Sequence, residues 1–521
     1  MPVTTRRRSN FQSTSTSTAT ATYADAAVDF SAHTLQPTLS LPPSPGAGAG
    51  ASKDVTTLSG TPITPSEATR ILNERAFDAA PPPPTRLRKA QLASLPAHEE
   101  NEDAYAYSFY PDPLSLRQKN SGAGTSTSTF HWSFFAVYDG HYGFATSRYL
   151  KDVLIQAVYT DLHRLYDTHP SHSPPSDDAV SATIAATFTR LDDDIISNIT
   201  STDVNPSQSC PHHSRFDIAT QGSCALLTFY DARSNRLFTA CTGDSRAVLG
   251  KRVGSASSTR WLAKPLSVDQ NFASNPAEVH RVRAEHPGED SIITQNRLMG
   301  DLAVSRAFGD ARFKARDTPT PPLHPLDFPD TAAVSSDGST SDDSEGGKCL
   351  SPKIQNSIDE AGLLLRRMST GTRSQIATPP YVTAEPVVST YSAVKDGDFL
   401  ILGSDGLWDF LSSEDAVALV GRWTDTQTDV QAGGNNSSHS TGGSPGKGQR
   451  QTTRLTQSQM ETFVFEGDEN AGVHLLRNAL GGARQSRLLF TLGLPPGRET
   501  AKRHRDDITV IVVFFARGGA L

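Results

Sequence analysis

The sequence predicts an α+β protein in which antiparallel sheets pack together and long helices cover them. Apolar residues recur at helical spacing over residues 144–158 and 180–196, so each segment is expected to form an amphipathic helix. Residues 225–230, 237–241 and 247–249 are short apolar runs with tight turns between them, which indicates consecutive antiparallel strands. Strands and helices that come in separate blocks favour packed sheets with the helices outside.

The composition of the chain limits what it can be. A hydrophobic fraction of 36% is low for a compact globule, so part of the 521 residues is expected to be disordered. The net charge of −8 gives no basic excess that would indicate nucleic-acid binding. The cysteines have the spacing of neither a zinc site nor a disulfide framework, which favours a reducing compartment. No stretch of the sequence is long and apolar enough to span a membrane.

Residues 1–60 are expected to be a disordered leader. Its first half is rich in Ser, Thr and Ala, carries arginines at positions 6–8 and has no acid before Asp25, which is typical of a mitochondrial transit peptide. An ordinary disordered tail is the alternative, because the arginines cluster instead of being spaced along one helix face. Residues 35–60 are rich in Pro, Gly, Ala and Ser and indicate a flexible linker.

Residues 61–86 are expected to form a short helix and a proline-rich spacer. The helix should begin after Thr64, because Thr64 and Glu67 have the spacing of a capping box and Pro65 occupies the first helical position. The prolines at 81–84 then favour an extended spacer.

The rest of the chain, residues 87–517, is expected to be one domain with two disordered insertions. Residues 315–378 are rich in Ser, Thr, Pro and Asp, and residues 425–456 in Gly, Ser, Asn, Thr and Gln. Neither segment can bury enough apolar surface to fold alone. Because strand-like runs resume after each of them, both are interpreted as surface insertions in a single domain.

Acidic residues stand at the ends of several predicted strands. Asp139 and Asp405 each follow an apolar run, whereas Asp506 and Asp507 directly precede one. Strand ends that converge while carrying acids make an oxygen-rich pocket, which suits Mg²⁺ or Mn²⁺. Adjacent acids repel each other unless cations or arginines compensate, and Arg505 could compensate for only one of them.

Glycines follow two of these acids and leave an alternative open. Asp139-Gly140 and Asp405-Gly406 each have the composition of a tight turn that merely reverses the chain after a strand. A functional role is favoured because both acids follow strongly apolar strands and precede helix-like segments. Both acids are therefore expected at strand exits.

Several short segments with these acids occur in a distinctive order along the chain. They are residues 102–103, 137–141, 222–223, 242–246, 300–310, 384–386, 402–409 and 505–510. Together they resemble the signature motifs of the metal-dependent protein phosphatases, the PP2C or PPM family. The resemblance implies an α-β-β-α sandwich, with two central antiparallel sheets flanked by helices and a metal centre in a cleft at one edge. It also implies hydrolysis of phosphoserine and phosphothreonine in proteins.

Residues 222–225, 266–270, 285–289 and 380–386 carry a narrower resemblance, to the mitochondrial pyruvate dehydrogenase phosphatase branch and in particular its fungal members. This branch implies the pyruvate dehydrogenase E1α subunit as the phosphoprotein substrate and a mitochondrial location, in the matrix or the intermembrane space. A cytosolic phosphatase of signalling kinases and a catalytically inactive regulatory module of the same fold are the alternatives. We expect a monomer.

The family resemblance implies a site for two cations, Mg²⁺ or Mn²⁺. Asp139 is expected to bridge both cations, and the Gly140 carbonyl to bind one of them. Asp405 and Asp506 are expected to complete the first cation's ligands. Two such cations lower the pKa of the water between them, and this water attacks phosphorus directly, without a covalent enzyme intermediate.

Four further acids are expected around this pair of cations. Glu102 and Asp103 are expected to hold waters that the cations bind. Asp244 and Asp409 match positions that bind a weaker third metal in some relatives. The alternative is that these last two merely shape a turn or a strand end.

His141 is expected to be the general acid that protonates the departing serine or threonine oxygen.

Two positions depart from the family's pattern. His98 stands where many relatives have an arginine that holds the substrate phosphate, so it either takes over that task or is an exposed histidine with no such role. Tyr142 replaces a usual glycine and is expected to narrow the site.

Overall fold

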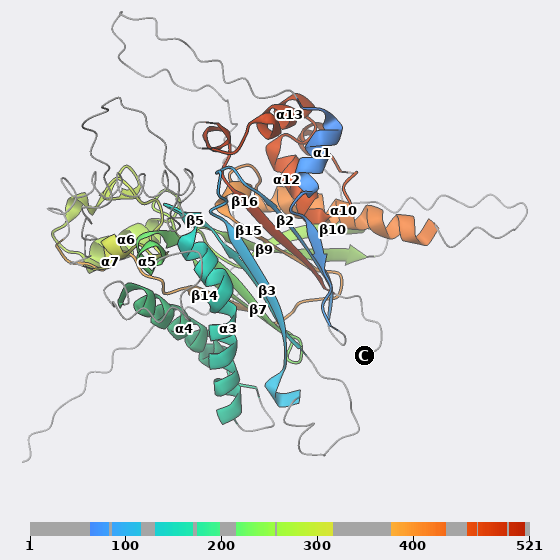
Figure 1. Cartoon of the computed structure of the whole chain (residues 1–521). Coiled ribbons are helices and arrows are strands. Elements are labelled where there is room, and N and C mark those ends of the chain that lie inside the picture. Colours follow the sequence, from blue (N-terminus) through green and yellow to red (C-terminus); the bar gives the residue numbers. More distant parts are fainter. Residues whose placement is uncertain are drawn as a thin grey trace, which may run out of the picture. The chain divides into compact units, whose positions relative to one another are not determined.

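Two large antiparallel sheets form the centre of the structure, which is a computed structural model (Figure 1). The structure describes residues 63–82, 86–115, 131–169, 174–197, 215–255, 258–315, 377–433, 456–465, 467–497 and 500–515. The six-stranded sheet has the order β1 (Phe77–Ala79), β2 (Leu87–Leu95), β16 (Ile508–Phe515), β15 (Phe399–Gly403), β9 (Arg246–Ser255) and β10 (Ser258–Pro265). The five-stranded sheet has the order β14 (Val387–Tyr391), β8 (Arg236–Thr242), β7 (Ala225–Asp231), β4 (His131–Tyr138) and β3 (Ala104–Pro111).

The two sheets pack face to face beneath helices, which explains why a central strand such as β16 is buried along its whole length. Ile511 and Val513 of β16 lie in an apolar cluster between the sheets, together with Val137 of β4. Val510 and Val512, which alternate with them, lie in a second cluster beneath helices. Successive side chains of a strand point to opposite faces, so a strand buried on both faces must be apolar at every position.

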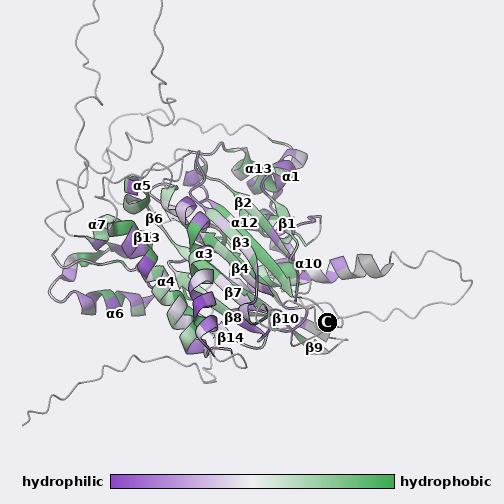
Figure 2. Cartoon of the chain, turned by 60° about the horizontal axis from the view of Figure 1, so that its bottom comes forward, coloured by the Kyte–Doolittle hydropathy of each residue, from purple (hydrophilic) through white to green (hydrophobic). Residues whose placement is uncertain are grey.

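Helices cover the outer face of each sheet (Figure 1). The six-stranded sheet carries α1 (Pro65–Asn73), α10 (Ser413–Gly433), α12 (Ala471–Leu480) and α13 (Gln485–Gly493). The five-stranded sheet carries α3 (Ala145–Thr168), α4 (Asp177–Ser197) and α5 (Arg215–Thr220). In Figure 2 the strands are coloured mainly as hydrophobic, whereas α3 carries both colours, as expected for helices with one buried face. The order of layers is helix, sheet, sheet, helix, which confirms the predicted fold class.

A small subdomain packs beside the sandwich around its own apolar cluster. It contains α6 (Pro276–Glu285), the hairpin of β11 (Ile293–Thr294) and β12 (Arg297–Leu298), and α7 (Ala311–Lys314). A three-stranded sheet of β13 (Phe308–Gly309), β6 (Gly222–Ser223) and β5 (Gly140–His141) connects it to the strands of the sandwich. The remaining short helices are α9 (Asp405–Trp408), α11 (Gln457–Thr462), η2 (Asp290–Ile292) and η4 (Ala501–Arg503).

The elements predicted from apolar periodicity are present. The helices expected at 144–158 and 180–196 are α3 and α4, and the three strands expected between residues 225 and 249 are β7, β8 and β9. The helix expected after Thr64 is α1, where the Glu67 backbone N–H donates to Thr64 Oγ1 at 3.2 Å. Apolar patterns and the capping box therefore identified these elements, although α3 extends ten residues beyond its predicted end, to Thr168.

The leader at 1–60 and nearly all of the insertion at 315–378 lie outside the described residues, as do parts of the proline-rich spacer. The second insertion was expected to begin at 425, but α10 continues to Gly433 before the described residues end. Within the part of the chain that the structure describes, no helix has the length and apolar character needed to cross a membrane.

Candidate active site

The predicted acids meet where strands of both sheets end. β15 and β16 are antiparallel neighbours with Gly403 opposite Val510, so the residues after β15 lie beside the residues before β16. This places Asp405 close enough to Asp506 for their charges to repel. Asp139, at the end of β4 in the other sheet, completes the group, because the Asp405 backbone N–H donates to its Oδ2 at 3.4 Å.

The electrostatics of this group favour a bound cation. Burial, followed by repulsion from Asp405 and Asp103, holds the pKa of Asp139 well above its usual range. Burial and the charges of Asp244 and Asp506 do the same to the pKa of Asp405. Carboxylates that repel each other away from water are costly unless positive charge compensates them. A divalent cation with oxygen ligands would supply that charge.

The loop before β3 brings Glu102 and Asp103 to the same place. The Glu102 carbonyl oxygen accepts a hydrogen bond from Ser147 Oγ at 2.5 Å. Asp103 is buried, and its Oδ2 accepts from Ser404 Oγ at 2.8 Å, directly before Asp405. The Asp103 carboxylate therefore borders Asp139 and Asp405, and the Glu102 carboxylate lies close enough to Asp506 for their charges to repel.

Gly140 fits the same picture because no side chain can be accommodated there. A Cβ on Gly140 would overlap the backbone carbonyl oxygen of Glu102 and would also come within 3.0 Å of Ser147 Oγ. The backbone after Asp139 thus packs directly against the Glu102 loop. Carboxylate oxygens next to an uncovered backbone carbonyl oxygen are the ligand atoms that Mg²⁺ and Mn²⁺ prefer.

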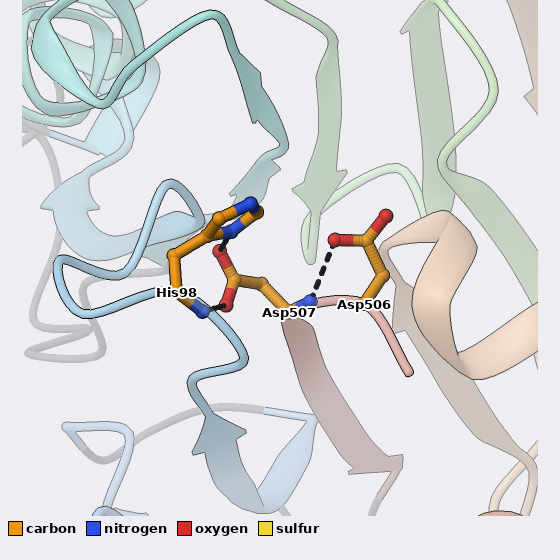
Figure 3. Close-up of side chains that lie close together, drawn as sticks. All are labelled: His98, Asp506 and Asp507. Atoms are coloured by element: carbon orange, nitrogen blue, oxygen red, sulfur yellow. Dashed lines mark hydrogen bonds and ion pairs between the residues drawn. The ribbon is translucent and has the colours of Figure 1, made fainter. Parts of the chain in front are cut away.

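Asp507 has a different task from its neighbour Asp506. The two carboxylates point to opposite sides, and that of Asp507 faces His98 (Figure 3). It accepts hydrogen bonds from the backbone N–H groups of Ala97, His98 and Glu102, the last at 2.8 Å. Burial alone would raise the pKa of Asp507, but the hydrogen bonds from His98 and this backbone lower it. Asp507 therefore anchors the loop as a carboxylate.

His98 is not the exposed histidine that one interpretation of the sequence expected. Its side chain is only 11% exposed, and Nδ1–H donates to Asp507 Oδ2 at 2.8 Å. Its Nε2 lies 3.7 Å from Glu102 Oε2. Because both ring nitrogens face carboxylates, His98 links Asp507 to Glu102, and nothing in this arrangement favours a phosphate-holding role.

Lys502 adds positive charge beside Asp506, in addition to that of Arg505, which attracts Asp507 and Asp506. Lys502 Nζ forms an ion pair with Asp506 Oδ1. Arg505 is buried, and burial lowers its pKa to about 10. Among the described residues, its Nε has no hydrogen-bond partner. Lys502 lies on η4 and Asp506 follows four residues later, and this i,i+4 spacing was the signal that could have predicted the pair.

The two acids expected at a third metal lie on either side of the group. Asp244 is buried, and its carboxylate accepts from Cys224 Sγ at 3.4 Å and from Asn271 Nδ2 at 3.4 Å. Ligand atoms of Asp139, Cys224 and Asp244 all lie within 4.8 Å of one another. Asp409 is exposed and follows α9, with its backbone N–H bonded to the Asp405 carbonyl at 2.9 Å.

His141 lies on β5, directly beyond Asp139 and Gly140. Its side chain is 22% exposed, and its Nε2 lies 2.7 Å from Asp310 Oδ2. Sequence reasoning did not single out Asp310, which comes from the far side of the three-stranded sheet. The imidazole is thus held at the border of the acidic group while remaining accessible.

Tyr142 turns toward the small subdomain. Its backbone has φ +62°, a conformation in which glycine is favoured, which accounts for the usual glycine here. Its hydroxyl donates to Asp301 Oδ1 at 3.0 Å, and the Arg312 guanidinium lies 4.3 Å from its ring centroid. These contacts tie the loop after His141 to the subdomain.

Comparison with known proteins agrees with this geometry. Residues 113–436 match the family described as protein phosphatase 2C. The chain belongs to the protein phosphatase 2C family. It is 36% identical over 389 residues to a protein phosphatase 2C homolog of Schizosaccharomyces pombe. The match covers 74% of this chain and 74% of that relative.

Two mitochondrial pyruvate dehydrogenase phosphatases are further relatives of this protein phosphatase 2C. The one from Saccharomyces cerevisiae is 30% identical over 463 residues, covering 84% of this chain and 70% of the relative. The bovine one is 31% identical over 379 residues, covering 71% of this chain and 60% of the relative.

As a protein phosphatase 2C, the protein is a metal-dependent protein serine/threonine phosphatase, and so a phosphoric monoester hydrolase. This confirms the predicted family and activity and argues against an inactive regulatory module. The family depends on Mg²⁺ or Mn²⁺, which agrees with the acidic group at the strand ends.

Proposed function

We propose that Asp139, the Gly140 carbonyl, Asp405 and Asp506 hold two Mg²⁺ or Mn²⁺ ions, with Asp139 bridging them. The observation that carries this proposal is the hydrogen bond from the Asp405 backbone to Asp139, which joins the ends of strands from the two sheets. Two such cations, when bound, lower the pKa of a water and offset charge on the phosphoryl group.

The neighbouring acids complete the proposed site. Glu102 and Asp103 border it and are suited to hold cation-bound waters. Asp244 lies near Asp139, and Asp409 follows the short helix that begins at Asp405. These two acids are the candidates for a third, weaker cation. By holding the cations in place, the carboxylates would orient the attacking water and the phosphate, so the reaction would gain from orientation as well as charge.

His141 is proposed to donate the proton that the leaving oxygen needs. It follows Gly140 and is accessible, so it can reach a substrate held at the acidic group. Attack on phosphorus breaks the bond to the serine oxygen, whose electron pair takes up the proton from the imidazolium. A serine alkoxide is a poor leaving group and requires this help, whereas p-nitrophenolate leaves without a proton.

The His141→Ala variant should therefore show a loss that depends on the leaving group. Hydrolysis of a phosphoseryl peptide should slow by about a hundredfold or more, the usual contribution of a general acid. Hydrolysis of p-nitrophenyl phosphate should slow far less. Steady-state kcat on both substrates measures this, and equal losses would instead assign His141 to the structure of the site.

The substrate is proposed to be the E1α subunit of pyruvate dehydrogenase, within mitochondria. This proposal is supported by the similarity to the Saccharomyces cerevisiae pyruvate dehydrogenase phosphatase, which extends over 84% of the chain. The arginine-bearing composition of residues 1–60 is consistent with it. A cytosolic phosphatase of signalling kinases is the second candidate, because the Schizosaccharomyces pombe relative is described only as a protein phosphatase 2C homolog.

Phosphate release from phosphorylated E1α, compared with an unrelated phosphoserine protein, tests the substrate. With Mg²⁺, kcat/KM should favour E1α by about tenfold or more, a preference that differential contacts can supply. Equal kcat/KM values would contradict the E1α proposal and leave the phosphatase intact. Release from neither substrate would contradict the enzyme itself. Fractionation of cells that express the full chain separates the two compartments.

A further inference from the structure

The His141 ring is held by a carboxylate that the three-stranded sheet brings to it. Within this sheet, β6 lies between β5 and β13, with Gly222 opposite both His141 and Gly309. Asp310 directly follows Gly309, and its Oδ2 lies 2.7 Å from His141 Nε2. Two side chains from the outer strands thus meet across the middle strand.

Gly222 is what allows them to meet. A Cβ at this position would overlap both His141 Nε2 and Asp310 Oδ2. Any other residue in the middle strand would fill the space where the imidazole and the carboxylate touch. The glycine therefore keeps open a direct contact between two residues that are 169 positions apart in the sequence.

Asp310 does not do what an aspartate at its position ordinarily does. It is the N-cap residue of α7, yet its side chain accepts no capping hydrogen bond from that helix. An N-cap aspartate usually accepts one from the first turn. Its backbone has φ +52°, in the left-handed region. The carboxylate is turned away from its own helix and toward His141.

The burial of Asp310 favours a functional role for its contact with His141. The residue is fully buried, and among the described residues its Oδ1 has no hydrogen-bond partner. A buried carboxylate with an unsatisfied oxygen costs stability, so it contributes little as a purely structural element. An orienting role for His141 accounts for both its position and its direction.

We propose that Asp310 is a positioning residue that accepts the Nε2–H of His141 and so leaves Nδ1 as the nitrogen that donates to the leaving oxygen. The inference rests on the proposed general-acid role of His141. In the step, the phosphorus–oxygen bond breaks with its electron pair on the serine oxygen, and the Nδ1–H bond gives that oxygen its proton. The neutral imidazole that remains keeps Nε2–H bonded to Asp310. Carboxylates orient catalytic imidazoles in this way in unrelated hydrolases.

The full chain with Asp310→Ala should reproduce the leaving-group pattern of His141→Ala in weaker form. We expect kcat on a phosphoseryl peptide to fall about 10- to 100-fold, the usual range for removing a group that orients a functional side chain. The kcat on p-nitrophenyl phosphate should fall much less. Asp310→Asn, which keeps an oxygen acceptor and nearly the same shape, should lose less than Asp310→Ala and guards against a variant that fails to fold.

Asp192→Asn is the matched control. Asp192 is also buried and accepts from the Gly309 backbone N–H at 2.9 Å, so its replacement disturbs the same strand end. It pairs with Lys314, and no contact to His141 is among its interactions. A leaving-group-dependent loss in this variant equal to that of Asp310→Asn would overturn the proposal, because it would reflect only local structure.

The double variant His141→Ala, Asp310→Ala decides whether the two residues act together. If Asp310 works through His141, the double variant should be no slower on the phosphoseryl peptide than His141→Ala alone, within about twofold. Additive losses would overturn the positioning role, as would equal losses of Asp310→Ala on both substrates. A His141→Ala variant without leaving-group selectivity would overturn the general acid itself and this inference with it.

Discussion

The Asp139→Asn variant is expected to lose nearly all activity on every phosphate ester. Loss of a group that merely supports a metal ligand typically costs 10- to 100-fold, so loss of the proposed bridging ligand should cost at least about 100-fold. Unlike His141→Ala, it should affect a phosphoseryl peptide and p-nitrophenyl phosphate alike. Steady-state kcat at saturating Mg²⁺ measures this, and a variant that keeps most of the parental rate would contradict the bridging role.

The same variant should remain folded. Its unfolding temperature should be higher than that of the parent without metal and lower than that of the parent with Mg²⁺. Burial and the charges of Asp405 and Asp103 make a carboxylate at position 139 unfavourable without a cation. Removing that charge should raise the unfolding temperature of the metal-free protein relative to the parent. With Mg²⁺ the order should reverse, because the parent gains more from binding.

Asp398→Asn is the control for this prediction. Asp398 is also buried and stands at the opposite end of β15 from Asp405. Its carboxylate accepts from the backbone N–H groups of Arg252 at 3.1 Å and Lys395 at 2.9 Å. The variant can lower the unfolding temperature, but it should keep kcat and the Mg²⁺ response close to those of the parent.

The convergence of the acids could be predicted because it follows from strand ends. Apolar runs such as that of β16 are visible in the sequence, and the acids beside them must lie at the rim of a sheet. The pairing of β15 with β16 then brings Asp405 to Asp506. The blocks of strands and helices indicated packed antiparallel sheets, whereas the specific α-β-β-α sandwich came from the family resemblance, because periodicity does not show which strands are neighbours.

The support around the site could not be predicted, because it depends on contacts between distant residues. Asp506 and Asp507 look alike in the sequence, but successive residues point to opposite sides at the start of a strand. Asp507 therefore faces the loop at Ala97 and His98, some four hundred positions away. Whether His98 was exposed could be settled only once that contact was known.

Asp310 was missed for a related reason. It follows a glycine before a short helix, so its local sequence indicates only a turn or a cap. Its contact with His141 exists because β5 and β13 both pair with β6. The end of helix α10 was also missed. The residues after 425 are polar and lack helical periodicity, yet they continue a helix whose first half has an apolar side.

Chelation of the metal is the second change with a very large expected effect. Burial and mutual repulsion raise the pKa of both Asp139 and Asp405, so bound cations would favour their charged forms. Lys502 forms an ion pair with Asp506, and the charge of Arg505 attracts Asp507 and Asp506. Divalent cations, when bound, would offset the charge of the acids and of a phosphoryl group together.

The most direct test is phosphate release from a phosphoseryl peptide by the full chain in EDTA, followed by addition of Mg²⁺ or Mn²⁺ in excess. We predict that EDTA abolishes release, that either cation restores it in a saturable manner, and that Asp139→Asn is not restored at cation concentrations that saturate the parent. Undiminished turnover in EDTA would contradict the metal-dependent mechanism and the role assigned to the acids at these strand ends.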